Sequence, residues 1–100
     1  MATPHAAAPP ILFVDDEPDL IDTFVNNFDR TFTLLTATSG PAALELLRAH
    51  EVAVLVTDQR MPEMHGLEVI RRGLEIRPDV IPVILTGFTN DADLIEAINL

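Results

Sequence analysis

The sequence predicts an α/β protein built on a doubly wound parallel sheet, and three observations support this. Two apolar runs, 11–14 and 52–57, have the length and composition of strands buried on both faces of a parallel sheet. Segments with helical spacing of apolar residues alternate with such runs along the chain. The connections are short, and successive strand-then-helix units imply right-handed crossovers with helices on both faces of the sheet.

Proline, glycine and capping residues mark where each element begins or ends. Pro18 suits the first turn of one helix, and Pro41 opens the next, with Ser39 and Gly40 as its cap. Pro78 ends the third helix. The predicted strands are 11–15, 32–37, 52–57 and 81–86, and the predicted helices are 18–28, one from 41, 66–76 and one capped by Asn90 or Asp91.

Apolar residues that recur every three or four positions define the inner face of each helix. In the first helix this stripe contains Ile21, Val25 and Phe28. We also expect Phe13, Phe24 and Phe28 to lie in the core. In the third helix, Gly73 interrupts the pattern at a cost of about 1 kcal/mol relative to alanine, and the sequence offers no reason for it.

Length and composition limit the function classes. The 100 residues suffice for one domain. The net charge of −10 argues against direct contact with nucleic acid or an anionic membrane. The chain has no cysteine, which excludes disulfides and thiolate chemistry, and every basic residue is arginine. Without a membrane-length apolar run or a signal peptide, we expect a cytoplasmic protein, with residues 1–10 as a disordered leader.

Acidic residues stand where two of the predicted strands end. Asp15 and Asp16 end the first strand, and Asp58 directly follows the third. The carboxyl ends of neighbouring parallel strands share one edge of the sheet, where ligands bind in open α/β folds. Three crowded carboxylates repel one another, and a hard divalent cation is the simplest reason for bringing them together.

Three motifs resemble the receiver domain of two-component response regulators. They are Val-Asp-Asp-Glu-Pro at 14–18, Asp-Gln-Arg-Met-Pro at 58–62 with Gly66, and Ile-Leu-Thr-Gly at 84–87. The resemblance covers nearly all of residues 11–100, and the motifs fall in the right order on the right strands. It implies the flavodoxin-like receiver fold, here with strand order 2-1-3-4 and without the last strand–helix unit that gives the family its order 2-1-3-4-5.

The resemblance also implies a role for each matching residue. Asp58 corresponds to the phosphoacceptor, which takes a phosphoryl group from a phosphohistidine or a small phosphodonor. Asp15, Asp16 and Asp58 correspond to the ligands of Mg²⁺, together with the backbone carbonyl of Arg60. Thr86 corresponds to the residue that hydrogen-bonds the phosphoryl group and acts as a switch. The implied partner is a sensor histidine kinase or phosphotransfer protein, and the output is a protein contact, not enzymatic turnover on an external substrate.

The chain departs from the family at its end, which lacks the fifth strand, its lysine and the fifth helix. In the family this lysine pairs with the phosphoryl group, and a hydrogen bond to a charged group contributes about 1.5–3 kcal/mol. Its loss should slow phosphorylation by roughly one or two orders of magnitude. The fourth strand is then an edge, with Val83, Ile84 and Leu85 poorly covered. We therefore expect a homodimer formed through the strand-four edge and the uncovered sheet face.

Other interpretations remain open. Asp16 or Glu17 could simply cap the helix that begins at Pro18. The domain could be a receiver-derived interaction module that works without phosphorylation. An aspartate-nucleophile phosphatase of the haloacid dehalogenase type is disfavoured, because its second aspartate is replaced here by Arg60. The three histidines, His5, His50 and His65, show no metal-ligand spacing and are expected to be solvated.

Overall fold

The computed structural model describes residues 8–85, which form one four-stranded parallel sheet in the order β2-β1-β3-β4. The predicted doubly wound α/β fold class and strand order are confirmed. The strands are β1 (Ile11–Val14), β2 (Leu34–Ala37), β3 (Val54–Asp58) and β4 (Ile81–Leu85). The helices are α1 (Pro18–Phe28), α2 (Gly40–Ala49) and α3 (Gly66–Ile76).

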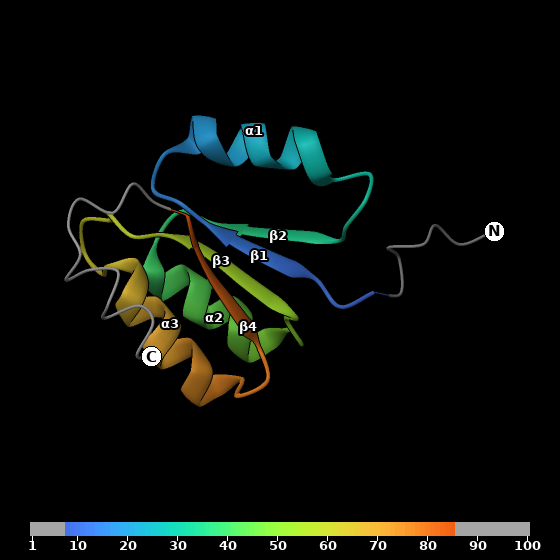
Figure 1. Ribbon diagram of the computed structural model, residues 1–100. Helices are drawn as coiled ribbons and strands as arrows, with labels where there is room; N and C mark the ends of the chain where they lie inside the picture. Colours follow the sequence, from blue (N-terminus) through green and yellow to red (C-terminus); the bar gives the residue numbers. More distant parts are fainter. Residues whose placement is uncertain (1–7, 86–100) are drawn as a thin grey trace.

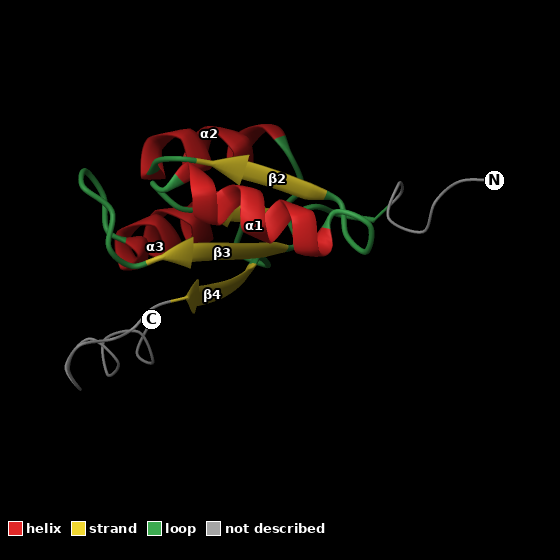
Figure 2. Ribbon diagram, turned by 90° about the horizontal axis from the view of Figure 1, so that it is seen from above, coloured by secondary structure: helices red, strands yellow, loops and turns green. Residues whose placement is uncertain are grey.

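The helices lie on both faces of the sheet (Figure 1). One face carries α1, and the other carries α2 and α3 side by side. Seen from above, α1 lies over the middle of the sheet, and β4 lies beside this helix, not beneath it (Figure 2). No helix within the described range is long and apolar enough to cross a membrane.

Helix boundaries agree closely with the prediction, because local residues set them. Both α1 and α3 span the predicted ranges, and α2 begins one residue earlier, at Gly40. Ser39 is the N-cap of α2, and its side-chain oxygen accepts a hydrogen bond from the Ala42 N–H at 3.2 Å. The predicted fourth helix, Thr86 and residues 1–7 of the predicted leader lie outside the described residues.

The strand boundaries were predicted less well. The second strand begins at Leu34, two residues later than predicted, because the Thr31 and Phe32 N–H groups both donate to the Phe28 carbonyl. The chain is therefore still turning where the prediction placed a strand. The third strand runs over residues 54–58 instead of 52–57, so Asp58 is its last residue.

The larger part of the core lies between the sheet and helices α2 and α3. Leu12 and Leu55 from the sheet and Leu47 from α2 are fully buried there. The same packing explains Gly73. A Cβ at this position would lie 3.0 Å from Leu47 Cδ1 and 3.1 Å from Leu55 Cδ2. Glycine therefore lets α3 lie close to both α2 and β3.

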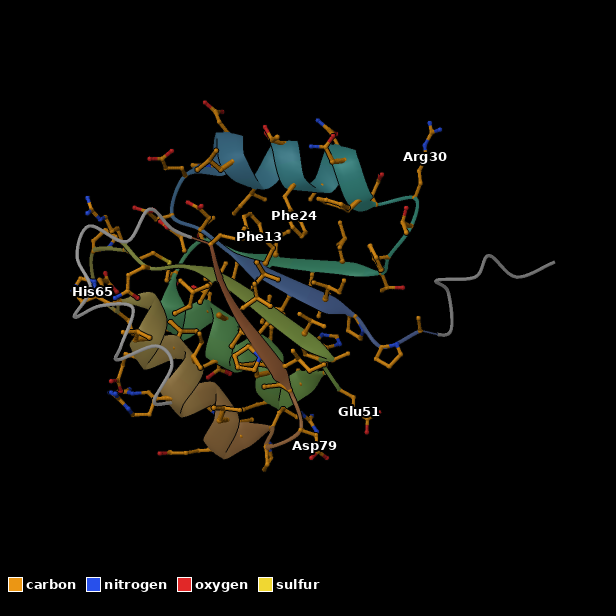
Figure 3. The ribbon with its side chains drawn as sticks, in the orientation of Figure 1. Phe13, Phe24, Arg30, Glu51, His65 and Asp79 are labelled. Atoms are coloured by element: carbon orange, nitrogen blue, oxygen red, sulfur yellow. The ribbon has the colours of Figure 1, made fainter. Side chains whose placement is uncertain are left out.

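A smaller cluster lies beneath α1. Phe13 from β1 stacks on Phe24 from α1, with ring centroids 4.2 Å apart (Figure 3). Phe28 continues this aromatic row at 4.9 Å from Phe24, but the residue is 40% exposed. The prediction that Phe28 lies in the core was wrong, because the last turn of α1 carries it to the surface, where it contacts the equally exposed Phe32.

Candidate metal centre at the carboxyl end of the sheet

Three carboxylates meet at the carboxyl edge of the sheet. The β1–β3 register pairs Val14 with Thr57, so Asp15 and Asp58 follow from neighbouring positions on adjacent strands. One oxygen atom each from Asp15, Asp16 and Asp58 lies within 4.8 Å of the other two. The predicted convergence of these side chains is confirmed. It follows from parallel pairing, which brings the ends of both strands to one edge.

Asp15 organises the turn from β1 into α1. Its side chain is 4% exposed, and its Oδ1 accepts a hydrogen bond from the Glu17 N–H at 2.9 Å. Glu17 occupies the N-cap position of α1, yet its side chain makes no capping hydrogen bond. Simple helix capping by Asp16 or Glu17 therefore does not account for the paired acids.

The electrostatics of the cluster favour a bound cation. Burial raises the pKa of the Asp15 carboxyl above its ordinary value, and the charges of Asp58 and Asp16 raise it further. The hydrogen bond from the Glu17 backbone opposes this rise, but the pKa stays raised. An ionised Asp15 thus carries a cost that a positive charge in the cluster would offset.

The donor set fits Mg²⁺. This ion prefers oxygen ligands and takes few of them from a protein, because it retains several waters. Asp15, Asp16 and Asp58 each offer one carboxylate oxygen, and these oxygens lie within 4.8 Å of one another. Asp16 and Asp58 are only partly buried, which leaves room for the waters that Mg²⁺ retains.

The loop after Asp58 is fixed to the start of α3. The Gln59 carbonyl accepts a hydrogen bond from the Gly66 N–H at 3.1 Å, and its side-chain Oε1 accepts one from the Leu67 N–H at 2.9 Å. A Cβ at Gly66 would lie 2.3 Å from the Asp58 carbonyl oxygen. Gly66 therefore allows α3 to begin directly against the backbone of Asp58.

The other residues singled out from the sequence lie as follows. Arg60 is exposed in the loop after β3, one residue beyond Gln59. His50 and His65 are exposed, and Figure 3 shows His65 at the loop before α3. Sequence reasoning missed the role of Gln59, because nothing local to it signals a partner eight positions away.

Comparison with known proteins identifies the class. Residues 11–100 match the response regulator receiver domain, so this chain belongs to the response regulator receiver family. The site just described lies on two of the three motifs that suggested this family. The four strands in order 2-1-3-4 with helices on both faces are the flavodoxin-like receiver fold, and this prediction is confirmed.

Individual relatives support the assignment. The chain is 34% identical over 89 residues to the hydrogenase transcriptional regulatory protein HoxA of Cupriavidus necator, covering 89% of this chain and 18% of HoxA. It is 32% identical over 91 residues to the response regulator SaeR of Staphylococcus aureus, covering 90% of this chain and 40% of SaeR. The chain thus spans less than half the length of either relative.

A solved structure also has a fold similar to that of this chain. The crystal structure of an adenylate cyclase from Rhodopirellula baltica superposes with a TM-score of 0.86 at 36% identity. The match covers 91% of this chain and 68% of that one.

Proposed function

We propose that this receiver domain is a phosphorelay component that accepts a phosphoryl group on Asp58 in a Mg²⁺-dependent reaction. The observation that carries the proposal is the convergence of Asp15, Asp16 and Asp58, whose oxygens lie within 4.8 Å of one another. Membership of the receiver family implies phosphorelay signalling in general. The assignment of each residue is the finer step that this geometry supports.

The chemistry is an in-line transfer to a carboxylate. An Asp58 oxygen attacks the phosphorus of a phosphohistidine or of acetyl phosphate, the bond from phosphorus to the donor breaks, and an acyl phosphate remains on Asp58. Asp15 and Asp16 would hold the cation together with Asp58 and the backbone carbonyl of Arg60. A Mg²⁺ ion held there would supply positive charge beside the transferring group. The family motif assigns Thr86, which lies outside the described residues, the hydrogen bond to the phosphoryl oxygen.

The test is a phosphorylation assay with a small donor. The protein is incubated with acetyl phosphate and Mg²⁺, and intact mass spectrometry measures the fraction that carries one phosphoryl group. The adduct is expected with wild type, and it should be absent with Asp58→Asn or when EDTA replaces Mg²⁺. An adduct of equal yield on Asp58→Asn, or none on wild type after prolonged incubation, contradicts the proposal.

The proposed protein partner is a sensor histidine kinase or phosphotransfer protein, and a second copy of the chain is proposed as a further partner. The support for a homodimer is an apolar surface on β4. Ile81, Val83 and Leu85 are 60%, 37% and 46% exposed. The register places Val83 beside Val56, which belongs to the cluster beneath α1, so these three side chains share the α1 face.

The backbone of β4 restricts how such a dimer forms. The Ile81 N–H donates to the Ala53 carbonyl of the neighbouring chain segment at 2.9 Å, so alternate residues Pro82 and Ile84 point their backbone groups to the other edge. Proline has no N–H, which leaves Ile84 as the one donor of β4 on that edge. The apolar face must therefore contribute more to a dimer than sheet extension does.

Sedimentation velocity at micromolar concentrations tests the homodimer. We expect a dimer for wild type, and a shift toward monomer for Val83→Glu, which introduces a charge into the exposed face. A stable, folded monomer of the wild-type chain contradicts this part of the proposal.

A second candidate function is an interaction module that works without phosphorylation. The specific observation that favours it is the exposed apolar face on β4. It gives no reason for three carboxylates in one place. Equal partner binding by wild type and Asp58→Ala would support this alternative, and binding that depends on acetyl phosphate would exclude it.

A further inference from the structure

We propose that Gln59 is a positioning residue for the metal centre, which extends the proposed function and depends on it. Gln59 lies in the chain between Asp58 and Arg60, which both contribute to the proposed Mg²⁺ site at the end of β3. Any movement of its backbone therefore moves the carboxylate on one side and the carbonyl on the other. Two hydrogen bonds, one to its backbone carbonyl and one to its side chain, fix the position of this residue.

Both hydrogen bonds of Gln59 run to the first turn of α3. Its backbone carbonyl accepts from the Gly66 N–H at 3.1 Å, and its side-chain Oε1 accepts from the Leu67 N–H at 2.9 Å. His65, at the N-cap of α3, makes no side-chain capping bond, so Gln59 takes over the capping role from outside the helix. The start of α3 and the end of β3 are thereby joined through one residue.

Apolar contacts hold residues 61–64 of the loop after β3. Residues 59 and 60 depend instead on the hydrogen bonds of Gln59. Met61 is 3% exposed, and Met64 packs so closely on α2 that a Cβ at Gly40 would lie 2.8 Å from the Met64 Cβ. These contacts hold residues 61–64 against the body of the domain. Between Asp58 and Met61, the hydrogen bonds of Gln59 fix the backbone together with the Thr57 hydroxyl, which donates to the Asp58 carbonyl at 2.9 Å.

Replacing a residue that positions metal ligands without binding the metal typically weakens metal affinity about tenfold or more. We expect such a loss of affinity from Gln59→Met, which keeps the length of the side chain and removes the acceptor for the Leu67 N–H. The matched control is Ser39→Ala, which removes the corresponding capping bond at the start of α2, where the Ser39 oxygen accepts from Ala42. Both variants lose one helix-capping hydrogen bond. Ser39 lines the same pocket as Asp16, but only Gln59 is bonded in the chain to two of the proposed ligands, Asp58 and Arg60.

Isothermal titration calorimetry with MgCl₂ measures the dissociation constant of each variant. Gln59→Met should bind Mg²⁺ about tenfold more weakly than wild type, and Ser39→Ala should bind it as wild type does. In the acetyl phosphate assay, the Mg²⁺ concentration for half-maximal adduct should rise by the same factor in Gln59→Met. The yield at saturating Mg²⁺ should stay unchanged, because Asp58 itself is intact.

Equal Mg²⁺ affinity of wild type and Gln59→Met, or an equal loss in Ser39→Ala, would overturn the inference and assign Gln59 a capping role alone. If wild type neither binds Mg²⁺ nor forms the adduct, the proposed function fails instead. A measurement on wild type covers the case in which Gln59→Met does not fold. Coupling is reciprocal, so Mg²⁺ should slow hydrogen exchange at the Gly66 and Leu67 amides, and unchanged exchange there refutes the coupling.

Discussion

Replacing Asp58 with asparagine should stabilise the fold when no divalent cation is present. One oxygen of each carboxylate in the cluster lies within 4.8 Å of the others. Two unit charges about 5 Å apart repel by about 0.8 kcal/mol even at the dielectric constant of bulk water. Asp58 takes part in two of the three pairwise repulsions. The substitution should therefore raise the free energy of unfolding by about 1–2 kcal/mol.

The assay is thermal unfolding in EDTA, followed by far-UV circular dichroism because the chain has no tryptophan or tyrosine. A gain of 1 kcal/mol raises the midpoint of a domain of this size by about 4–8 °C. The control is Asp79→Asn, which removes the same charge from an exposed position between α3 and β4, far from the cluster (Figure 3). Adding Mg²⁺ should then stabilise wild type more than Asp58→Asn, because the ligand set is complete only in wild type.

Two results would refute this reasoning. An unchanged or lower midpoint for Asp58→Asn in EDTA would mean that the carboxylates do not repel one another in the folded state. An equal gain for Asp79→Asn would mean that relief of the overall charge of −10, and not of the local cluster, stabilises the variant.

Four further substitutions should change stability. Gly66→Ala should lose about 1–3 kcal/mol, because its Cβ would meet the Asp58 carbonyl at 2.3 Å. Gly73→Ala should lose less when both variants are compared by urea titration, because its contacts are side-chain ends at 3.0 and 3.1 Å. Asp15→Asn should stabilise the metal-free protein at pH 7. The pKa of Asp15 is raised in the fold, so its ionisation destabilises the native state as pH rises through that pKa. The advantage of the variant should therefore shrink as pH falls toward about 4, and a constant difference across that range contradicts it. Arg77→Met should lose about 1–3 kcal/mol, because the Arg77 Nε donates at 2.8 Å to a carbonyl near the end of α2; an unchanged denaturation midpoint would show that this bond contributes nothing.

Much of the fold and of the candidate site could be predicted from local sequence. Pro18, Ser39 and Gly66 act within a few residues of the helix ends that they define, so those ends were predicted to within one residue. The meeting of Asp15, Asp16 and Asp58 was also predictable. Once the strands are parallel neighbours, residues at their carboxyl ends share an edge without any further information.

Distances between elements lay beyond such reasoning. The close approach that Gly73 permits depends on Leu47 and Leu55, which come from two other elements. The exposure of Phe28 depends on how far α1 extends past the sheet, and the partner of the Gln59 side chain depends on where α3 begins in space. Periodicity and capping act over single turns of the chain, whereas these contacts arise when separately formed elements pack together. The chain's own chemistry therefore specified the elements and the acidic cluster, and their packing specified how tightly that cluster is held.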